Sequence, residues 1–294
     1  MKITITGASG LIGAKLVERL RARGDDVTTL SRNPSSPGAV AWRPEDEPAP
    51  TSALDGRDAV VHLAGEEVAQ RWSDGAKRRI RSSRELGTRN LVAGIEAAEP
   101  RPRALVASSA VGYYGPHGDE RVDEQAPPGS DFLAEVCVTW EREAQRAADV
   151  GLRVVNVRTG VVLARGGGAL AKMLPFFKLG IGGPVAGGDQ YLPWIHVDDV
   201  VGIYLAALDG EDWSGPVNAT APEPVTNKAF SKALGRALHR PAFAPVPGLA
   251  VRALYGEMAE IVTKGQRVVP RRAQELGYAF GHTDLDEALR SALN

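Results

Sequence analysis

The chain has 294 residues, of which 43% are hydrophobic and 24% are charged, and its formal net charge is -1. This length suits one large α/β unit, or a nucleotide-binding domain that carries a smaller lobe. The charge gives no reason to expect nucleic acid or an anionic membrane surface as a partner, and no apolar run approaches the ~18 residues of a membrane span. The single cysteine, Cys137, excludes an internal disulfide and a cysteine-based metal cage.

Strand and helix signals alternate along the first part of the chain. The predicted strands cover residues 2–6, 26–31, 39–42, 59–63, 104–108 and 153–157. The predicted helices cover residues 11–23, 74–98, 132–150 and 169–179. Residues 34–50 contain too many prolines for a helix. Apolar strands that are separated by helices predict an α/β fold with a doubly wound parallel sheet of the Rossmann type.

The character of the sequence changes after Gly166, where glycine-rich and proline-rich loops precede several helices. We therefore expect residues 1–165 to form the Rossmann-type domain and residues 166–294 to form a smaller, mostly helical lobe. Residues 196–220 are expected to return to the first domain. No targeting segment is recognisable before the first strand, so we expect a cytoplasmic protein that is a monomer or a homodimer.

The most specific motif is the glycine-rich turn after the first strand, where residues 2–13 read KITITGASGLIG. Its first glycine permits the tight turn, its second lets backbone N–H groups approach a pyrophosphate, and its third lets the helix pack close to the strand. Because the strand before it and the helix after it are both present, the motif predicts a dinucleotide phosphate at the helix N-terminus. The residues expected to contact it are Gly7, Ser9, Gly10, Leu11, Ile12 and Gly13.

The residues at the end of the second strand indicate which dinucleotide binds. NAD sites usually place an acidic residue there, about 20 residues beyond the glycines, whereas this chain has Ser31 and Arg32. A carboxylate would repel a 2′-phosphate, while Ser31 can donate a hydrogen bond to it and Arg32 can pair with it. Since a charge-assisted hydrogen bond contributes roughly 1.5–3 kcal/mol, we predict a preference for NADP(H) of about 10- to 100-fold. The alternative is that Arg32 is a solvated loop charge.

Six segments, including the glycine-rich turn, form one set: GASGLIG at residues 7–13, DAVVHLAG at 58–65, SSAVGYYG at 108–115, RTGVVL at 158–163, WIHVDDV at 194–200 and VPRR at 269–272. This set resembles the extended short-chain dehydrogenase/reductases, which include sugar-nucleotide epimerases and dehydratases. It is most similar to an epimerase-like branch that is mostly uncharacterised and is sometimes labelled a cell-division inhibitor. The resemblance covers essentially the whole chain, and it implies a Rossmann domain with NADP(H) along the strand ends and a C-terminal lobe that holds substrate.

The same motifs supply further candidate contacts. Cofactor contacts are expected at Leu63, Ala64, Gly65, Arg158 and Gly160. Substrate contacts are expected at Gln190 and Trp194, which precede His196 on a strand that would line the cleft. Arg84, on the long helix, is grouped with the cofactor residues because it could point toward the cofactor or the substrate. A solvated helix face is the simpler interpretation of Arg84.

One departure from the family pattern concerns the reaction itself. The resemblance implies a Tyr-x-x-x-Lys on the helix after the serine segment, where the tyrosine moves a proton and the lysine makes it acidic enough to do so. None of the six tyrosines is followed by lysine four residues later, and the expected positions fall on Leu133 and Cys137. A bare tyrosine has a pKa of about 10 and is a poor base at neutral pH. Since positioned acid–base groups supply a factor of about 10²–10⁴, the standard redox step should be severely slowed unless other residues replace the pair.

The candidate replacements lie in the serine segment. Ser109 would lie near the nicotinamide and hydrogen-bond a substrate oxygen, with a strand-end cap as the equal alternative. Tyr113 or Tyr114 could donate a proton, although aromatic residues beside glycine more often serve packing. Cys137 is predicted to be a small buried apolar residue, and His196 is predicted to cap a helix. No group of histidine, aspartate and glutamate has metal-ligand spacing, so no metal is expected.

Two functional classes remain. The first is an NADP(H)-dependent oxidoreductase or epimerase-like enzyme that acts on a small carbonyl, hydroxyl or sugar-nucleotide substrate, with Ser109, a neighbouring tyrosine or water in place of the missing pair. The second is a protein without turnover, in which NADP(H) occupancy sets its shape and its partners. We favour the first class because the segments expected to form the cleft, residues 180–194 and 246–272, remain elaborate. Hydride transfer from NADPH to a panel of carbonyl compounds discriminates the two.

Overall fold

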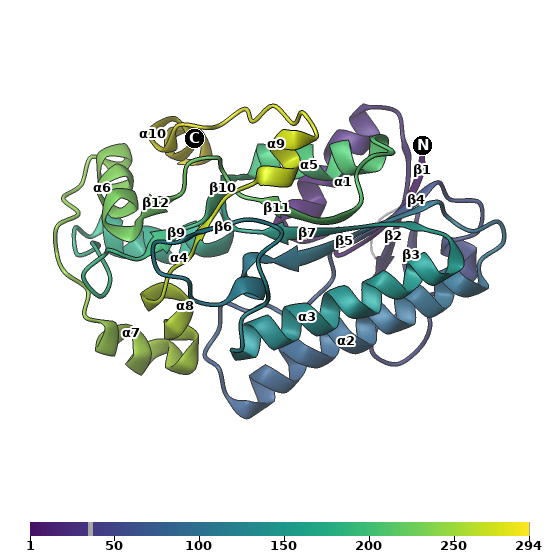
Figure 1. Cartoon of the computed structure of the whole chain (residues 1–294), viewed down its shortest axis with the longest axis horizontal. Helices are drawn as coiled ribbons and strands as arrows, with labels where there is room; N and C mark the ends of the chain where they lie inside the picture. Colours follow the sequence, from purple (N-terminus) through teal and green to yellow (C-terminus); the bar gives the residue numbers. More distant parts are fainter. Residues whose placement is uncertain (35–37, 294) are drawn as a thin grey trace.

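Seven parallel strands form the central sheet of the computed structural model, which describes residues 1–34 and 38–293 (Figure 1). Every neighbouring pair in this sheet is parallel. In spatial order the strands are β11 (Gly215–Ala219), β7 (Arg153–Thr159), β5 (Ala104–Ala110), β4 (Ala59–His62), β1 (Lys2–Thr6), β2 (Asp26–Ser31) and β3 (Ala39–Ala41). The predicted doubly wound Rossmann sheet is confirmed. Pro37, in the predicted proline-rich connection, lies outside the described residues.

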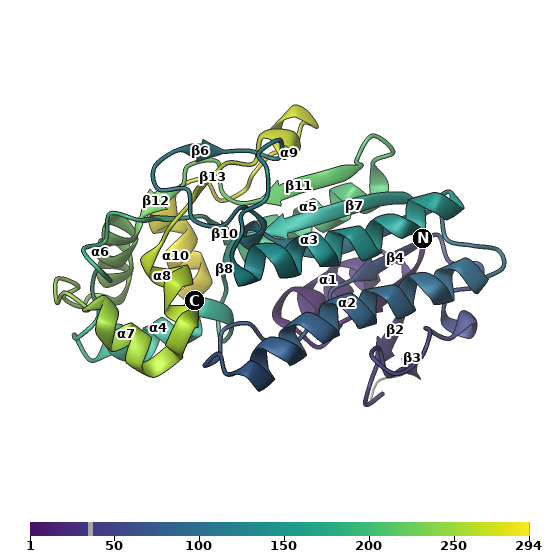
Figure 2. The same ribbon diagram turned by 60° about the horizontal axis from the view of Figure 1, so that its bottom comes forward.

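Helices cover both faces of the sheet (Figure 2). On one face lie α1 (Leu11–Ala22) and α5 (Val197–Asp209), and on the other lie α2 (Asp74–Ala97) and α3 (Phe132–Gln145). The neighbouring residues Val60 and Val61 of β4 pack into the two opposite cores. A strand that is buried on both faces gains from an apolar side chain at every position, which explains the continuous apolar runs in the sequence.

The largest differences from the predicted strand and helix ends concern β5, β7 and α3. β5 and β7 each continue two residues beyond the predicted end, so Ser109 and Arg158 belong to strands and lie opposite each other in register. The apolar pattern that marks these strands in the sequence stops earlier, because the side chains of Ser109 and Arg158 are polar. The predicted helix over residues 132–150 is divided, because α3 ends at Gln145 and a 3-10 turn (Arg146–Val150) leads to Gly151 at a φ of 89°.

The C-terminal part forms a second, smaller core beside the sheet. This core is built from α4 (Gly168–Lys178), α6 (Asn227–Leu238) and α10 (Leu285–Leu293). The remaining helices there are α7 (Gly248–Tyr255), α8 (Ala259–Thr263) and α9 (Arg271–Glu275). Three two-stranded pairings join distant segments: β8 (Val161–Leu163) with β10 (Trp194–His196), β9 (Tyr191–Leu192) with β12 (Val225–Thr226), and β6 (Arg121–Val122) with β13 (Arg267–Val268).

Short 3-10 turns complete the described elements, at Thr51–Ala53, Val111–Tyr114 and Gly256–Met258. The chain runs from β7 through the second core and back to β11 at the edge of the main sheet (Figure 1). Within the part of the chain that the structure describes, no helix is both long and apolar enough to cross a membrane.

Candidate functional site

The glycine turn joins β1 to α1 by close backbone contacts. Gly7 has a φ of 70°, and a Cβ there would lie 2.6 Å from the carbonyl carbon of Leu63. A Cβ on Gly13 would lie 2.2 Å from the carbonyl oxygen of Gly7. No side chain caps the start of α1, where Gly10 is the N-cap. The first backbone N–H groups of the helix are therefore available to an anion, which the helix dipole also favours.

The end of β2 offers a cation to the solvent. Arg32 is exposed, and the hydroxyl of Ser31 is half-buried and accepts a hydrogen bond from the backbone N–H of Asn33 at 3.2 Å. No acidic side chain follows directly at this strand end. A phosphate at this edge would meet a guanidinium and a hydroxyl and no carboxylate of the same segment.

The loop after β4 lies against the glycine turn. The backbone N–H groups of Leu63 and Ala64 donate to the hydroxyl of Thr6, at 3.1 and 3.2 Å. These bonds fix the carboxyl ends of β1 and β4 relative to each other. Leu63 and Ala64 are half-buried and Gly65 is exposed, so this segment forms part of the accessible strand edge.

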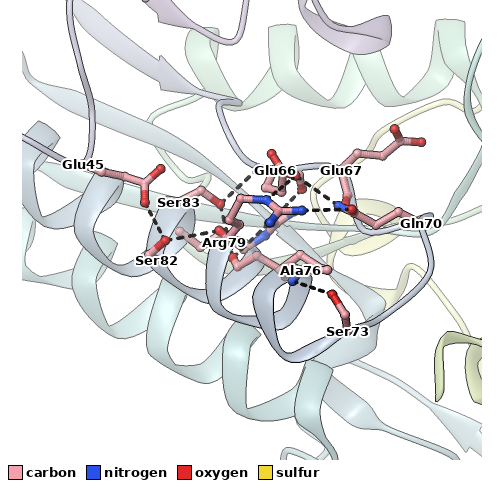
Figure 3. Close-up of polar contacts among 11 residues, drawn as sticks. Glu45, Glu66, Glu67, Gln70, Ser73, Ala76, Arg79, Ser82 and Ser83 are labelled. Carbon is pink, nitrogen blue, oxygen red and sulfur yellow. Dashed lines mark hydrogen bonds and ion pairs between the residues drawn. The ribbon is translucent and has the colours of Figure 1, made fainter. Parts of the chain in front are cut away.

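Polar side chains tie the rest of this loop to α2 (Figure 3). Glu66 donates its backbone N–H to the hydroxyl of Ser83, and its carboxylate accepts from Gln70 at 3.1 Å and from Arg79 at 3.3 Å. The hydrogen bond from Gln70, together with the charges of Arg79 and Arg32, holds the pKa of the Glu66 carboxyl below its usual value. The loop is thus held on the side of α2 that faces the strand ends.

Arg84 lies beneath this loop. Its Nη1 donates to the backbone oxygens of Glu66 and Ile80, at 3.0 and 3.2 Å, and its Cζ lies 4.8 Å from the ring centroid of Trp140 on α3. The guanidinium carbon is 3.2 Å from the position that a Cβ on Gly65 would take. Arg84 is therefore not on a solvated helix face, because it fills the space between α2, α3 and the loop.

Arg158 and Ser109 belong to one buried network at the ends of β5 and β7. The guanidinium of Arg158 makes two 2.8 Å hydrogen bonds to the two carboxylate oxygens of Glu141 on α3, and the Ser109 hydroxyl donates to the same carboxylate at 2.6 Å. Arg158 is 3% exposed and Ser109 is 2% exposed. The structure does not favour the predicted contact between Arg158 and the cofactor, because Glu141 already satisfies this buried charge. The ion pair raises the pKa of Arg158 despite its burial.

The two neighbouring tyrosines have different environments. Tyr114 is fully buried, and its hydroxyl donates to the side-chain oxygen of Asn218 at 2.6 Å and accepts from Arg158 at 3.0 Å. Burial raises the pKa of Tyr114. Tyr113 is half-buried, and its ring stacks on the Arg158 guanidinium with 3.4 Å between Cζ and the ring centroid. The geometry makes Tyr114 a poor candidate for the predicted proton donor and leaves Tyr113.

The positions of the missing pair lie on the face of α3 that looks toward this network. A Cβ on Gly112 would lie 3.3 Å from Leu133 and 3.9 Å from the sulfur of Cys137. Cys137 is buried and free, and burial raises the pKa of its thiol to about 12. The prediction of a buried apolar cysteine is confirmed. Leu133, Cys137 and Glu141 are spaced four residues apart, so they share one face of α3.

The two predicted substrate residues, Gln190 and Trp194, both donate hydrogen bonds to backbone oxygens. Trp194 is 1% exposed and donates its indole N–H to the backbone oxygen of Glu223 at 3.2 Å. The side-chain amide of Gln190 donates to the backbone oxygens of Val185 and Val262. The burial of Trp194 does not favour a contact with substrate, and the amide N–H donors of Gln190 are already used. Gly160 packs against Pro193, whose oxygen would lie 2.2 Å from a Cβ there.

His196 caps α5, as predicted, because its Nδ1 accepts from the backbone N–H of Asp198 at 3.2 Å. The fold also brings His282 against it, with ring centroids 3.7 Å apart, so that His196, Asp198 and His282 form one cluster. Spacing along the sequence could not reveal this cluster, which joins residues far apart in the chain. The Asp198 carboxylate lies 2.7 Å from Nζ of Lys15, and the capping bond occupies Nδ1 of His196. Nε2 of His196 is buried and has no hydrogen-bond partner among the described residues.

Comparisons with known proteins cover nearly the whole chain. Residues 3–218 match the model of the NAD dependent epimerase/dehydratase family, and residues 246–292 match a domain of unknown function. The chain belongs to the NAD-dependent epimerase/dehydratase family. This assignment agrees with the fold, in which the glycine turn, the loop after β4 and the serine segment all lie at the carboxyl ends of neighbouring strands.

Relatives within this epimerase family are similar over most or all of their length. The epimerase family protein SDR39U1 of Bos taurus is 40% identical over 100% of both chains, and the chloroplastic homologue of Arabidopsis thaliana is 42% identical over 100% of this chain and 87% of its own. A crystal structure of human SDR39U1 with NADPH has a TM-score of 0.92 and 38% identity, covering 99% of each chain. The human protein therefore binds NADPH within essentially the same fold.

The sequence analysis of this family member missed two polar residues of the network at the ends of β5 and β7, Glu141 and Asn218. Glu141 could have been found, because helical spacing places it on the face of α3 that already held Leu133 and Cys137. Asn218 gave no such signal. Its side chain reaches Tyr114 from β11, more than a hundred residues away along the chain.

Proposed function

We propose that the chain binds NADP(H) across the carboxyl ends of its parallel strands and transfers hydride between the nicotinamide and a small carbonyl or hydroxyl compound. The observation that carries the proposal is the combination of an uncapped glycine turn at α1 with an exposed Arg32 and no acidic side chain at the end of β2. The family match and the NADPH in the human relative support it.

The cofactor contacts follow the strand edge. The backbone N–H groups after Gly10 would hold the pyrophosphate, and Ser31 with Arg32 would hold the 2′-phosphate. Leu63, Ala64 and Gly65 would border the ribose groups, and the nicotinamide would lie at the ends of β4 and β5. Residues 166–294 would cover the substrate. NADPH, when bound, supplies the hydride, and the chain supplies orientation and a proton.

Tyr113 is the proposed proton donor. Its ring is fixed from below by Arg158, which Glu141 holds in one geometry. Its hydroxyl is not tied to a buried partner in the way that the hydroxyl of Tyr114 is. Ser109 acts as a positioning residue, because its hydroxyl is committed to Glu141. Fixing a donor in this way avoids the entropic cost of orienting it during the reaction.

The experiment measures oxidation of NADPH with a panel of aldehydes, ketones, 2-oxo acids and sugar nucleotides. We expect turnover with at least one class and a loss of about 10²–10⁴-fold on Tyr113→Phe. A matched control is Tyr278→Phe, which removes a half-buried tyrosine hydroxyl that donates to the backbone oxygen of Asp199, outside the serine segment and outside residues 180–194 and 246–272. Tight NADPH binding without oxidation of any compound would instead support the second functional class, a binding or regulatory protein.

A further inference from the structure

Positive charge and exposed apolar side chains gather in the C-terminal part of the chain. Residues 224–256 contain five lysines and arginines and no aspartate or glutamate, although the whole chain has 35 basic and 36 acidic residues. Apart from Met1, every exposed large hydrophobic side chain of the described residues belongs to α4, α7, α8 or the loops that adjoin them. These helices lie with α6 at the end of the molecule opposite β2 and β3 (Figures 1 and 2). This end has the composition of an interaction site.

The positive side chains border an open groove of about 750 Å³ along α6. Lys228, Lys232 and Arg236 follow one another at intervals of four residues, so they share one face of the helix, and Arg240 continues the line beyond the helix end. All four side chains are exposed. Phe243 supplies an apolar wall and is itself 81% exposed. We call this feature, defined by these five residues, the basic groove.

Backbone contacts hold the walls of the basic groove in place. The N–H of Val246 donates to the oxygen of Pro184 at 2.8 Å, and the N–H of Arg240 donates to the oxygen of Gly235 at 2.9 Å. Gly235 also packs tightly on the loop after α6, since a Cβ there would lie 2.5 Å from the Cβ of Ala242. The groove is therefore formed before a partner arrives, which lowers the entropic cost of binding.

The charges of the basic groove are only partly neutralised within the chain. Arg236 donates to both carboxylate oxygens of Asp286, at 2.9 and 2.7 Å. Among the described residues, no carboxylate forms an ion pair with Lys228, Lys232 or Arg240. Like charges four residues apart on a helix repel each other, and Lys228 lies in the first turn, where the helix dipole favours an acidic side chain. An anion along the groove relieves both effects.

The spacing of these cations matches an extended acidic peptide. Side chains four residues apart on a helix are about 6 Å apart along its axis. Alternate side chains of an extended strand point to the same side and are about 7 Å apart. Carboxylates at every second position of an extended segment can therefore meet successive cations of the basic groove.

The apolar surroundings favour a peptide over the other anionic partners. Leu179 and Ile181 are exposed beside the groove, because Gly180 between them lies against Pro241, where a Cβ would be 3.6 Å from the proline ring. Surfaces that bind single-stranded nucleic acid pair cations with aromatic platforms instead of aliphatic side chains. A flat bilayer does not enter a concave groove. A second copy of this chain, docked symmetrically, would bring the same cations to face one another.

We propose that the basic groove binds an extended acidic segment of a partner protein. Carboxylates at alternate positions of the segment pair with Lys228, Lys232 and Arg240, and an apolar side chain between them packs on Phe243. The proposal does not rest on hydride transfer, because these residues belong to α6 and the loop that follows it and not to the strand ends.

Fluorescence polarisation on the full chain tests the proposal. The probe is a labelled octapeptide in which glutamate alternates with leucine, and two comparison peptides carry glutamine in place of glutamate or serine in place of leucine. We expect the probe to bind with a Kd below about 100 μM, and each comparison peptide to bind at least about tenfold more weakly. Lys228→Gln/Lys232→Gln should weaken binding of the probe at least about tenfold, and Phe243→Ser at least about threefold.

The charge-matched control is Arg21→Gln/Arg78→Gln, which removes two exposed arginines of α1 and α2, outside the groove. It should change the Kd of the probe less than about threefold. The proposal is overturned if the probe does not bind the wild-type protein, if both double variants lose the same affinity, or if either comparison peptide binds as tightly as the probe. Tighter binding of oligothymidylate, or of vesicles of phosphatidylserine and phosphatidylcholine, that depends on Lys228 and Lys232 overturns the peptide assignment in favour of nucleic acid or a membrane.

Discussion

The two ends of the strand edge use hydrogen-bonding groups in opposite ways. At β1 and β2 the start of α1 is uncapped and Arg32 is exposed. At β5 and β7 the polar side chains are hydrogen-bonded to one another, because Ser109 and Arg158 both donate to the Glu141 carboxylate. We call the first end the receptor, because the N–H groups at the start of α1 and the guanidinium of Arg32 are available to an anion. We call the second end the frame, because Ser109, Arg158 and Glu141 hold one another in place.

This difference separates binding from chemistry. A receptor needs unsatisfied donors of fixed geometry, which the glycine turn supplies from the backbone alone. A frame needs fully satisfied groups, because a partly satisfied buried network is costly. At the β5–β7 end, Tyr113 departs from this pattern, because its ring is half-buried. We expect any proton transfer that the protein performs to depend on Tyr113 directly and on the frame only indirectly.

The largest expected effect is a loss of stability when the ion pair at the β5–β7 end is broken. Glu141→Gln leaves the buried Arg158 guanidinium without its counter-charge, and we expect the free energy of unfolding to fall by about 3–5 kcal/mol. Chemical denaturation measures it. Glu260→Gln is the control, because Glu260 pairs with Lys264 on the surface and an exposed pair contributes about 0–1 kcal/mol. Equal losses for the two variants would contradict the description of the β5–β7 end as a rigid frame.

The next largest effect is a loss of NADPH affinity when the glycine turn at the β1–β2 end is changed. Gly13→Ala places a methyl group against the oxygen of Gly7, where a Cβ would lie only 2.2 Å away. The turn must open, and we expect NADPH affinity to fall at least about 100-fold, near 3 kcal/mol. Gly24→Ala is the matched control, because Gly24 also has a positive φ, of 88°, but has open space around it. We expect this substitution to lower the free energy of unfolding by only about 1 kcal/mol. Unchanged NADPH binding by Gly13→Ala would place the cofactor elsewhere.

Two buried histidines give the third prediction. His62 is held between the hydroxyls of Thr6 and Thr88, and burial lowers its pKa to about 4; burial also lowers the pKa of His196 to about 4. The unfolded chain takes up these protons near pH 6.5 and the folded chain does not. Stability should therefore be complete above pH 6.5 and fall by up to about 3 kcal/mol per histidine as the pH drops toward 4.

Denaturant unfolding at pH 7.5, 6 and 4.5 measures this loss. In His62→Gln, the pH dependence of the free energy of unfolding between pH 6.5 and 4 should be smaller by the contribution of one proton. A variant with the same pH dependence as the wild-type protein would show that His62 titrates normally in the folded state.

The smallest effect on stability distinguishes the paired tyrosines. Tyr114→Phe leaves Asn218 and one N–H of Arg158 unpaired in the interior, so we expect a loss of about 1–3 kcal/mol in the free energy of unfolding. Tyr113→Phe should change it by less than about 0.5 kcal/mol while it reduces turnover. A similar stability loss in both variants would remove the distinction between frame and proton donor.

The sequence predicts well what is decided locally. The strand, glycine turn and helix at residues 2–22 lie next to one another in the chain, so their geometry is visible in a short stretch of letters. The burial of Cys137 and the cap at His196 also follow from local pattern. The alternation of apolar strands and helices predicts the parallel sheet, because each element is buried on both faces by its neighbours.

The sequence predicts poorly what depends on distant partners. Trp194 and Arg158 have the residue types of ligand contacts, yet Glu223 and Glu141 satisfy them through contacts that only the fold creates. Tyr113 and Tyr114 are adjacent and chemically identical, and the polar partners of β7 and β11 decide that Tyr114 is buried. Propensity and spacing contain no information on such pairings.

The central claim is that the β1–β2 end is a receptor for NADP(H). The most direct measurement is a calorimetric titration of the wild-type protein and Arg32→Gln with NADPH and with NADH. We predict that the wild-type protein prefers NADPH by about 10- to 100-fold, and that Arg32→Gln loses most of this preference without weakening NADH. Equal affinities of the wild-type protein for NADPH and NADH, or a preference that survives Arg32→Gln, would contradict the account.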